Sequence, residues 1–100
     1  MFFSNPVPTR PISDYEPANK LALYHYDSCF YCRMVRSTID RLGVEVEYRN
    51  IIQDPEHRAE LQNARGRTTV PVLRGFTEND DWWMPESRDI IRYLEENYSD

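Results

Sequence analysis

Strand-like and helix-like stretches alternate between residues 21 and 98, and this alternation constrains the fold more than any other feature of the chain. The apolar and aromatic run "LALYHY" (residues 21–26) is typical of a central strand, and residues 31–42 place apolar side chains at helical spacing. Residues 44–51 then alternate apolar and polar side chains, as a strand does. A strand, a helix and a strand within about 30 residues predict a βαβ unit with parallel strands and a right-handed crossover.

The second half of the chain predicts a further helix, a hairpin and a last helix. Asp54 is the expected N-cap of a helix that has Pro55 at its first position and ends at Gly66. A strand (70–76), a turn (77–81), a paired strand (82–84) and an amphipathic helix (86–98) follow. The expected order is therefore β-α-β-α-β-β-α: an α/β, thioredoxin-like fold with a four-stranded mixed sheet flanked by helices.

Residues 1–20 carry four of the prolines and show no periodicity, so we expect an extended, mobile N-terminal tail ahead of one domain at residues 21–100. A formal net charge of −5 argues against a nucleic-acid partner. The chain has no apolar run that could span a bilayer and no secretory signal, which predicts a cytoplasmic protein without a membrane partner. We expect it to be a monomer.

The two cysteines of the chain, Cys29 and Cys32, lie where the first strand gives way to the first helix. A helix N-terminus favours a thiolate over a thiol, so Cys29 is the expected nucleophile at the exposed end of the helix. Cys32, one turn further, is expected to be more buried and to act as the resolving thiol. Arg33 and Arg36 add positive charge, whereas Asp27 should oppose thiolate formation.

Two other uses of the cysteine pair stay open. A structural zinc site requires four ligands, and the chain offers only His25 and His57 besides the cysteines, each on a different predicted element. A purely structural disulfide that closes so short a loop would stabilise the fold little. A C-x-x-C pair beside a βαβ pattern favours a redox dithiol over both.

Three segments in this order, "SCFYC", "GRTTVPVL" and "MPESRDIIRYLEE", resemble the glutaredoxins and the N-terminal domain of the glutathione transferases. The likeness covers about residues 21–98. It implies a glutathione-dependent thiol–disulfide oxidoreductase in which Cys29 and Cys32 form the redox-active disulfide. Glutathione would be the co-substrate, and proteins that carry a disulfide or a bound glutathione would be the partners.

The resemblance also implies a glutathione groove. A cis bond before Pro71 would turn the backbone of Val70 toward the cysteinyl part of glutathione. The other implied contacts are Glu86 and Ser87 for the γ-glutamyl group, Gln62 and Arg67 for the glycine carboxylate, and Tyr31 at the rim.

Phe30 departs from the family pattern, which has proline at this position. Some family members without that proline hold a [2Fe–2S] cluster between two subunits. One alternative is therefore a homodimer in which two Cys29 thiolates and two glutathiones bind such a cluster; another is a glutathione-binding module without strong turnover. Trp82 and Trp83 should face opposite sides of their strand, one in the core and one over a face.

Overall fold

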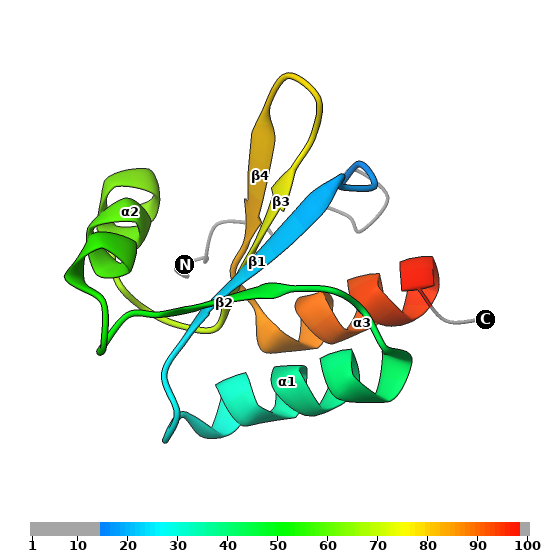
Figure 1. The fold of residues 1–100 in the computed structure, drawn as a ribbon, viewed down its shortest axis with the longest axis horizontal. Helices are drawn as coiled ribbons and strands as arrows, with labels where there is room; N and C mark the ends of the chain where they lie inside the picture. Colours follow the sequence, from blue (N-terminus) through cyan, green and yellow to red (C-terminus); the bar gives the residue numbers. More distant parts are fainter. Residues whose placement is uncertain (1–14, 99–100) are drawn as a thin grey trace, which may run out of the picture.

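The computed structural model describes residues 15–98, and most of the predicted tail lies outside them. The expected element order is confirmed (Figure 1). The elements are β1 (Lys20–His25), α1 (Phe30–Leu42), β2 (Glu47–Asn50), α2 (Pro55–Arg65), β3 (Val72–Phe76), β4 (Asp81–Met84) and α3 (Ser87–Tyr98). None of these helices is long and apolar enough to cross a membrane.

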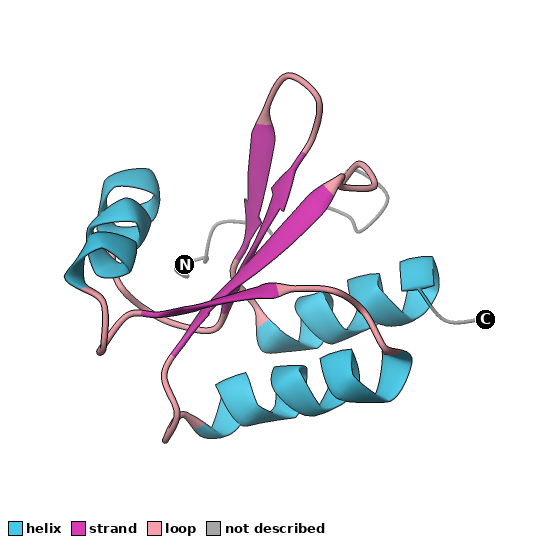
Figure 2. Cartoon of the chain, viewed as in Figure 1, coloured by secondary structure: helices cyan, strands magenta, loops and turns pink. Residues whose placement is uncertain are grey.

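The four strands form one mixed sheet in the order β2-β1-β3-β4. β1 and β2 are parallel, and β3 is antiparallel to both β1 and β4. Figure 2 shows α1 and α3 lying side by side along one face of the sheet, with α2 on the other side. The fold class predicted from the sequence, a thioredoxin-like α/β fold, is confirmed.

The main core lies between the sheet and the α1–α3 pair, and a smaller cluster lies under α2. Both clusters draw on alternate residues of β1, because successive side chains of a strand point to opposite faces. The main cluster contains Leu21 and Leu23, whereas the smaller one contains Ala22 and Tyr24. The two tryptophans divide in the same way: Trp82 belongs to the main core and Trp83 packs against the smaller cluster, as predicted.

The predicted helix ends are confirmed by the backbone. Gly43 and Gly66 follow α1 and α2 with φ of 70° and 73°, a left-handed conformation that glycine adopts at little cost. The carboxylate of Asp54 accepts a hydrogen bond from the backbone N–H of Glu56 at 2.9 Å, so it caps α2.

Other predicted boundaries were wrong by a few residues. β2 begins at Glu47 rather than at residue 44, although Val44 and Val46 still pack against the main core. β3 begins at Val72, because the preceding proline has no N–H to give to the sheet. Met34 was expected on the apolar face of α1 but is 41% exposed.

Residues that precede position 21 also contact the rest of the described chain. The ring of Tyr15 is buried and stands edge-on to Trp82, with 5.1 Å between the ring centroids. The Trp82 Nε1–H donates to the carbonyl of Glu16 at 2.9 Å, and the N–H of Asn19 donates to the carbonyl of Phe76 at 2.8 Å. The described part of the predicted tail, residues 15–20, therefore packs against the rest of the described chain, and the domain boundary stays a prediction.

Candidate functional site: the cysteine edge of the sheet

The sheet topology brings four chain segments to one edge. Because β1, β2 and β4 run in the same direction, the segments that follow them lie at the same edge as the segment that precedes β3. The register agrees, since Tyr24 near the end of β1 pairs with Val72 at the start of β3, and Leu73 pairs with Met84 at the end of β4. We call this side of the molecule the cysteine edge.

Cys29 lies at the cysteine edge as the N-cap residue of α1. Its Sγ accepts a hydrogen bond from the backbone N–H of Cys32 at 3.2 Å and lies 4.0 Å from the carbonyl oxygen of Val70. The backbone N–H of Cys29 donates to the carbonyl of Tyr26 at 3.2 Å, which closes the loop before the helix. The side chain is only 8% exposed, so the expectation of an exposed nucleophile was wrong.

Cys32 is completely buried, and both cysteines are free thiols in the structure. Burial, together with its hydrogen bond to Cys29, raises the pKa of Cys32 to about 12. The positive charge of Arg36 acts in the opposite direction. At neutral pH Cys32 therefore keeps its proton, while the helix N-terminus and the Cys32 N–H are directed at the Cys29 sulfur.

The sequence did not reveal that Asp27 and Arg36 form a pair. Asp27 precedes Cys29 in the β1–α1 loop, and its Oδ1 lies 3.5 Å from Nη1 of Arg36 on α1. The negative charge that was expected to oppose the thiolate thus has a positive partner. An ion pair between a loop and a helix has no local sequence signature, because it depends on how the loop turns.

The residues implied for the main part of the glutathione groove also lie at the cysteine edge. The bond between Val70 and Pro71 is cis, as the resemblance implied, and Pro71 is buried directly before β3. Ser87 is the first residue of α3, and the carbonyl of Glu86 accepts from the N–H of Ile90 at 2.9 Å. The side chain of Glu86 is exposed. The ligand contacts of these residues stay predictions.

The remaining implied contacts lie around this centre. Gln62 is exposed on α2, and Arg67 is exposed in the segment that leads from α2 to Val70. Tyr31 is 58% exposed, and its ring stands edge-on to that of Phe30 at a centroid distance of 5.4 Å. The fold therefore gathers Cys29, Val70, Pro71, Glu86 and Ser87 at one edge, whereas the position of Gln62 depends on how α2 is held.

A polar network holds α2 to the sheet. The buried Tyr24 hydroxyl donates to Oε1 of Glu60 at 2.8 Å and accepts from Nη1 of Arg49 at 2.8 Å and Nη1 of Arg74 at 3.1 Å. Nη1 of Arg49 also donates to Glu60 at 3.0 Å. α2 has a single buried residue, Leu61, so these hydrogen bonds carry much of its attachment. The sequence contains these residues but does not reveal that they contact one another, because those contacts depend on strand register.

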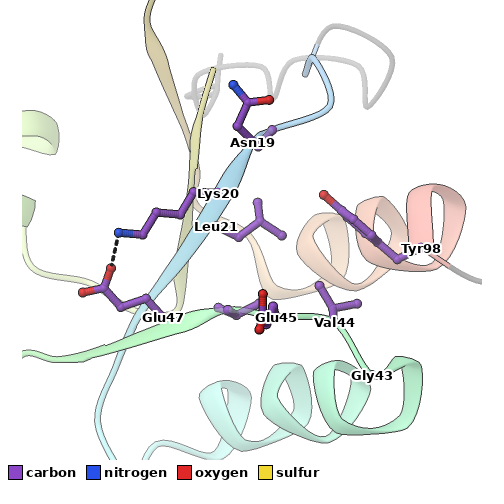
Figure 3. A pocket seen from close by; sticks show the side chains of 10 residues that line it. Asn19, Lys20, Leu21, Gly43, Val44, Glu45, Glu47 and Tyr98 are labelled. Atoms are coloured by element: carbon purple, nitrogen blue, oxygen red, sulfur yellow. Dashed lines mark ion pairs between the residues drawn. The ribbon is translucent and has the colours of Figure 1, made fainter. Parts of the chain in front are cut away.

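A surface hollow of about 500 Å³ lies at the opposite edge of the sheet (Figure 3). Its lining comes from the start of β1, the segment between α1 and β2, and the end of α3, and an ion pair of 3.1 Å between Lys20 and Glu47 crosses its rim. It shares no residue with the cysteine edge. Within residues 15–98, no group of three or more side chains is arranged to hold a metal ion.

Comparisons with solved structures agree with the fold. Maleylacetoacetate isomerase from Anaeromyxobacter dehalogenans 2CP-1, solved with bound GSH in its active site, has a TM-score of 0.62 and 26% identity over 79% of this chain and 38% of its own. Glutathione transferase E6 from Drosophila melanogaster has a TM-score of 0.62 and 32% identity over 81% of this chain and 36% of its own. Glutathione transferase Omega 2S from Trametes versicolor, at 14% identity and a TM-score of 0.66, shares the fold.

This chain thus spans well under half the length of the solved relatives. A search of curated proteins found no match. The chain does match a protein family over residues 23–100, and that family is described as "Glutathione S-transferase, N-terminal domain". The protein therefore belongs to the glutathione S-transferase N-terminal domain family, with its thioredoxin-like fold.

Proposed function

We propose that this domain is a glutathione-dependent thiol–disulfide oxidoreductase of the glutaredoxin type. One observation carries the proposal: the Cys29 sulfur caps a helix N-terminus and accepts a hydrogen bond from the backbone N–H of the second cysteine, Cys32. This arrangement directs backbone N–H groups at the Cys29 sulfur and keeps a second thiol one helical turn away. The family membership supports glutathione as the co-substrate.

The cysteine edge offers a candidate partner for each part of glutathione. The backbone of Val70 would pair with the cysteinyl residue, as an extended peptide pairs with a strand. Ser87 at the start of α3 would bind the α-carboxylate of the γ-glutamyl group, since the first N–H groups of a helix bind anions, and Glu86 would bind its amine. Arg67 and Gln62 would bind the glycine carboxylate. Tyr31 would line the rim.

The reaction is an exchange of disulfides. The Cys29 thiolate attacks the glutathione sulfur of a protein–glutathione mixed disulfide, the protein thiolate leaves, and Cys29 now carries glutathione. A second glutathione thiolate can attack the glutathione sulfur of this adduct, so that the bond to Cys29 breaks, Cys29 leaves as a thiolate and glutathione disulfide is formed. Alternatively, Cys32 attacks Cys29, and glutathione leaves as the Cys29–Cys32 disulfide forms.

The family match favours a second candidate function, the addition of glutathione to a carbon electrophile or a glutathione-assisted isomerisation. The solved relatives include glutathione transferases and an isomerase. In that case the domain would bind glutathione at the same edge, and the thiol of glutathione rather than Cys29 would attack the substrate. Cys32 would then have no role in turnover.

Steady-state turnover separates these functions. Reduction of a glutathione mixed disulfide, coupled to glutathione reductase and NADPH, is measured for the wild type, Cys29→Ser and Cys32→Ser, and conjugation to a chlorinated nitroarene is measured in parallel. We expect Cys29→Ser to be inactive in reduction and Cys32→Ser to keep substantial activity. Conjugation without reduction would favour the transferase. Visible absorption after anaerobic purification, with two chains and two glutathiones per cluster, would instead favour the [2Fe–2S] dimer.

A further inference from the structure

Arg36 lies one helical turn after Cys32 on α1, and contacts from two other elements fix its guanidinium. Nη1 lies 3.5 Å from the carboxylate of Asp27 in the β1–α1 loop. The guanidinium carbon lies 5.4 Å from the centroid of the Tyr48 ring on β2. The side chains of residues four apart on a helix are neighbours, so this fixed cation lies on the Cys32 side of α1.

The other titratable groups around Arg36 are His25, Tyr48, Asp27 and Asp40, whose exposed carboxylate lies one helical turn further along α1. His25 on β1 is 4% exposed, and burial together with the Arg36 charge lowers its pKa, so the imidazole is neutral at neutral pH. Burial also raises the pKa of Tyr48, which stays a neutral phenol. The Asp27 side chain is 69% exposed, and solvent screens its charge more than that of Arg36, which is 37% exposed.

We propose that Arg36 is a positioning residue that promotes closure of the Cys29–Cys32 disulfide by stabilising the negative charge on the Cys32 sulfur. The inference rests on the proposed function. It concerns the choice between the two routes by which glutathione leaves Cys29, which are attack by a second glutathione and attack by Cys32. A fully buried thiol attacks slowly because its thiolate is rare. The Arg36 charge offsets part of that cost, so glutathione can leave by closure as well as by attack of a second glutathione.

The closure step balances without an external oxidant. Cys32 gives its proton to water, and its sulfur bonds to the Cys29 sulfur. The bond between Cys29 and glutathione breaks, and glutathione leaves as a thiolate that is then protonated. One disulfide is exchanged for another.

The expected effect is moderate. The Arg36 charge lowers the pKa of Cys32, and a nearby opposite charge raises the charged fraction of a group by about tenfold. A thiolate of lower pKa is also a weaker nucleophile, with a Brønsted coefficient of about 0.4–0.5, so the net gain in rate is about threefold to fourfold.

The experiment measures closure directly. Reduced protein is mixed with glutathione disulfide near neutral pH at low salt, samples are quenched with acid, and mass spectrometry follows the decay of the singly glutathionylated protein. We expect Arg36→Gln to slow this first-order decay about threefold. Arg36→Lys, which keeps the charge, should retain most of the wild-type rate. Arg41→Gln is the matched control, because Arg41 lies on α1 like Arg36 but more than two turns from Cys32, and its ion-pair partner is Glu95 on α3.

Salt gives a second test that needs no variant. Raising the ionic strength should slow closure in the wild type, and the difference in closure rate between the wild type and Arg36→Gln should become smaller. Three results would each overturn the inference. The first is a wild-type closure rate that does not depend on salt, and the second is closure of Arg36→Gln at the wild-type rate. The third is an equal loss of turnover when Arg36→Gln is placed in the Cys32→Ser background. If the glutathione adduct forms in none of the proteins, the proposed function fails instead.

Discussion

Replacing Tyr24 with phenylalanine removes the hydroxyl that joins α2 to the sheet. That oxygen donates to Glu60 and accepts from Arg49 and Arg74, at 2.8, 2.8 and 3.1 Å. A neutral hydrogen bond contributes about 1 kcal/mol net to stability, and one to a charged group about 1.5–3 kcal/mol. Adding such contributions for the three hydrogen bonds of Tyr24 would predict a large loss of stability.

The actual loss should be smaller, because the charged partners keep other contacts. Arg49 stays bonded to Glu60 at 3.0 Å, and Arg74 stays paired with Asp81 at 2.7 Å. No charge is left buried and unpaired. We therefore expect Tyr24→Phe to lower the free energy of unfolding by about 1–2 kcal/mol, with the loss concentrated in the attachment of α2.

Two assays test this reasoning. Urea unfolding gives the change in free energy, and amide hydrogen exchange shows whether α2 (Pro55–Arg65) loses more protection than α1. Tyr26→Phe is the control, because Tyr26 packs against the same small cluster and its hydroxyl makes no hydrogen bond to the described residues. A uniform loss of protection over both helices, or an equal effect of the control, would refute the account of α2.

Three further predictions follow from the packing and the charges. A Cβ at Gly75 would overlap the six-membered ring of Trp82, so Gly75→Ala should cost about 1–3 kcal/mol in urea unfolding; a neutral result would mean that the ring can shift freely. Tyr15→Ala should lower the free energy of unfolding by about 3 kcal/mol, because Tyr15 packs on Trp82. An unchanged unfolding midpoint would mean that Tyr15 does not stabilise the fold. Burial alone would raise the pKa of Glu60, but the Tyr24 hydroxyl and Arg49 outweigh it and leave that pKa below its ordinary value of 4.5. Its stabilisation should therefore be complete above 4.5 and lost as the pH falls through the folded-state pKa, so the unfolding midpoints of wild type and Glu60→Gln should converge at acid pH rather than stay apart.

Local signals predicted the order of the elements well. Asp54 with Pro55 marked the start of a helix, Gly43 and Gly66 marked two ends, and the adjacent tryptophans had to face opposite sides of a strand. Each of these signals rests on backbone geometry within a few residues. The position of the site segments at the cysteine edge followed from the strand directions once the topology was known.

Other features depend on contacts between distant segments, and the sequence could not supply them. The high proline content and the missing periodicity of residues 1–20 said nothing of Tyr15, whose burial depends on Trp82, a partner far along the chain. The exposure of Cys29 was overestimated, because Val70 comes close to its sulfur. The pairing of Asp27 with Arg36 required the path of the loop.

Trapping of glutathione on Cys29 tests the central claim most directly. Cys32→Ser, which cannot close the disulfide, is mixed with a glutathionylated peptide, and its mass is measured with and without the added change Cys29→Ser. The account predicts the gain of one glutathione on Cys29 and release of the free peptide thiol, with no gain in the double variant. A single variant that gains no glutathione, or a double variant that gains as much, would contradict the role of Cys29 as the nucleophile.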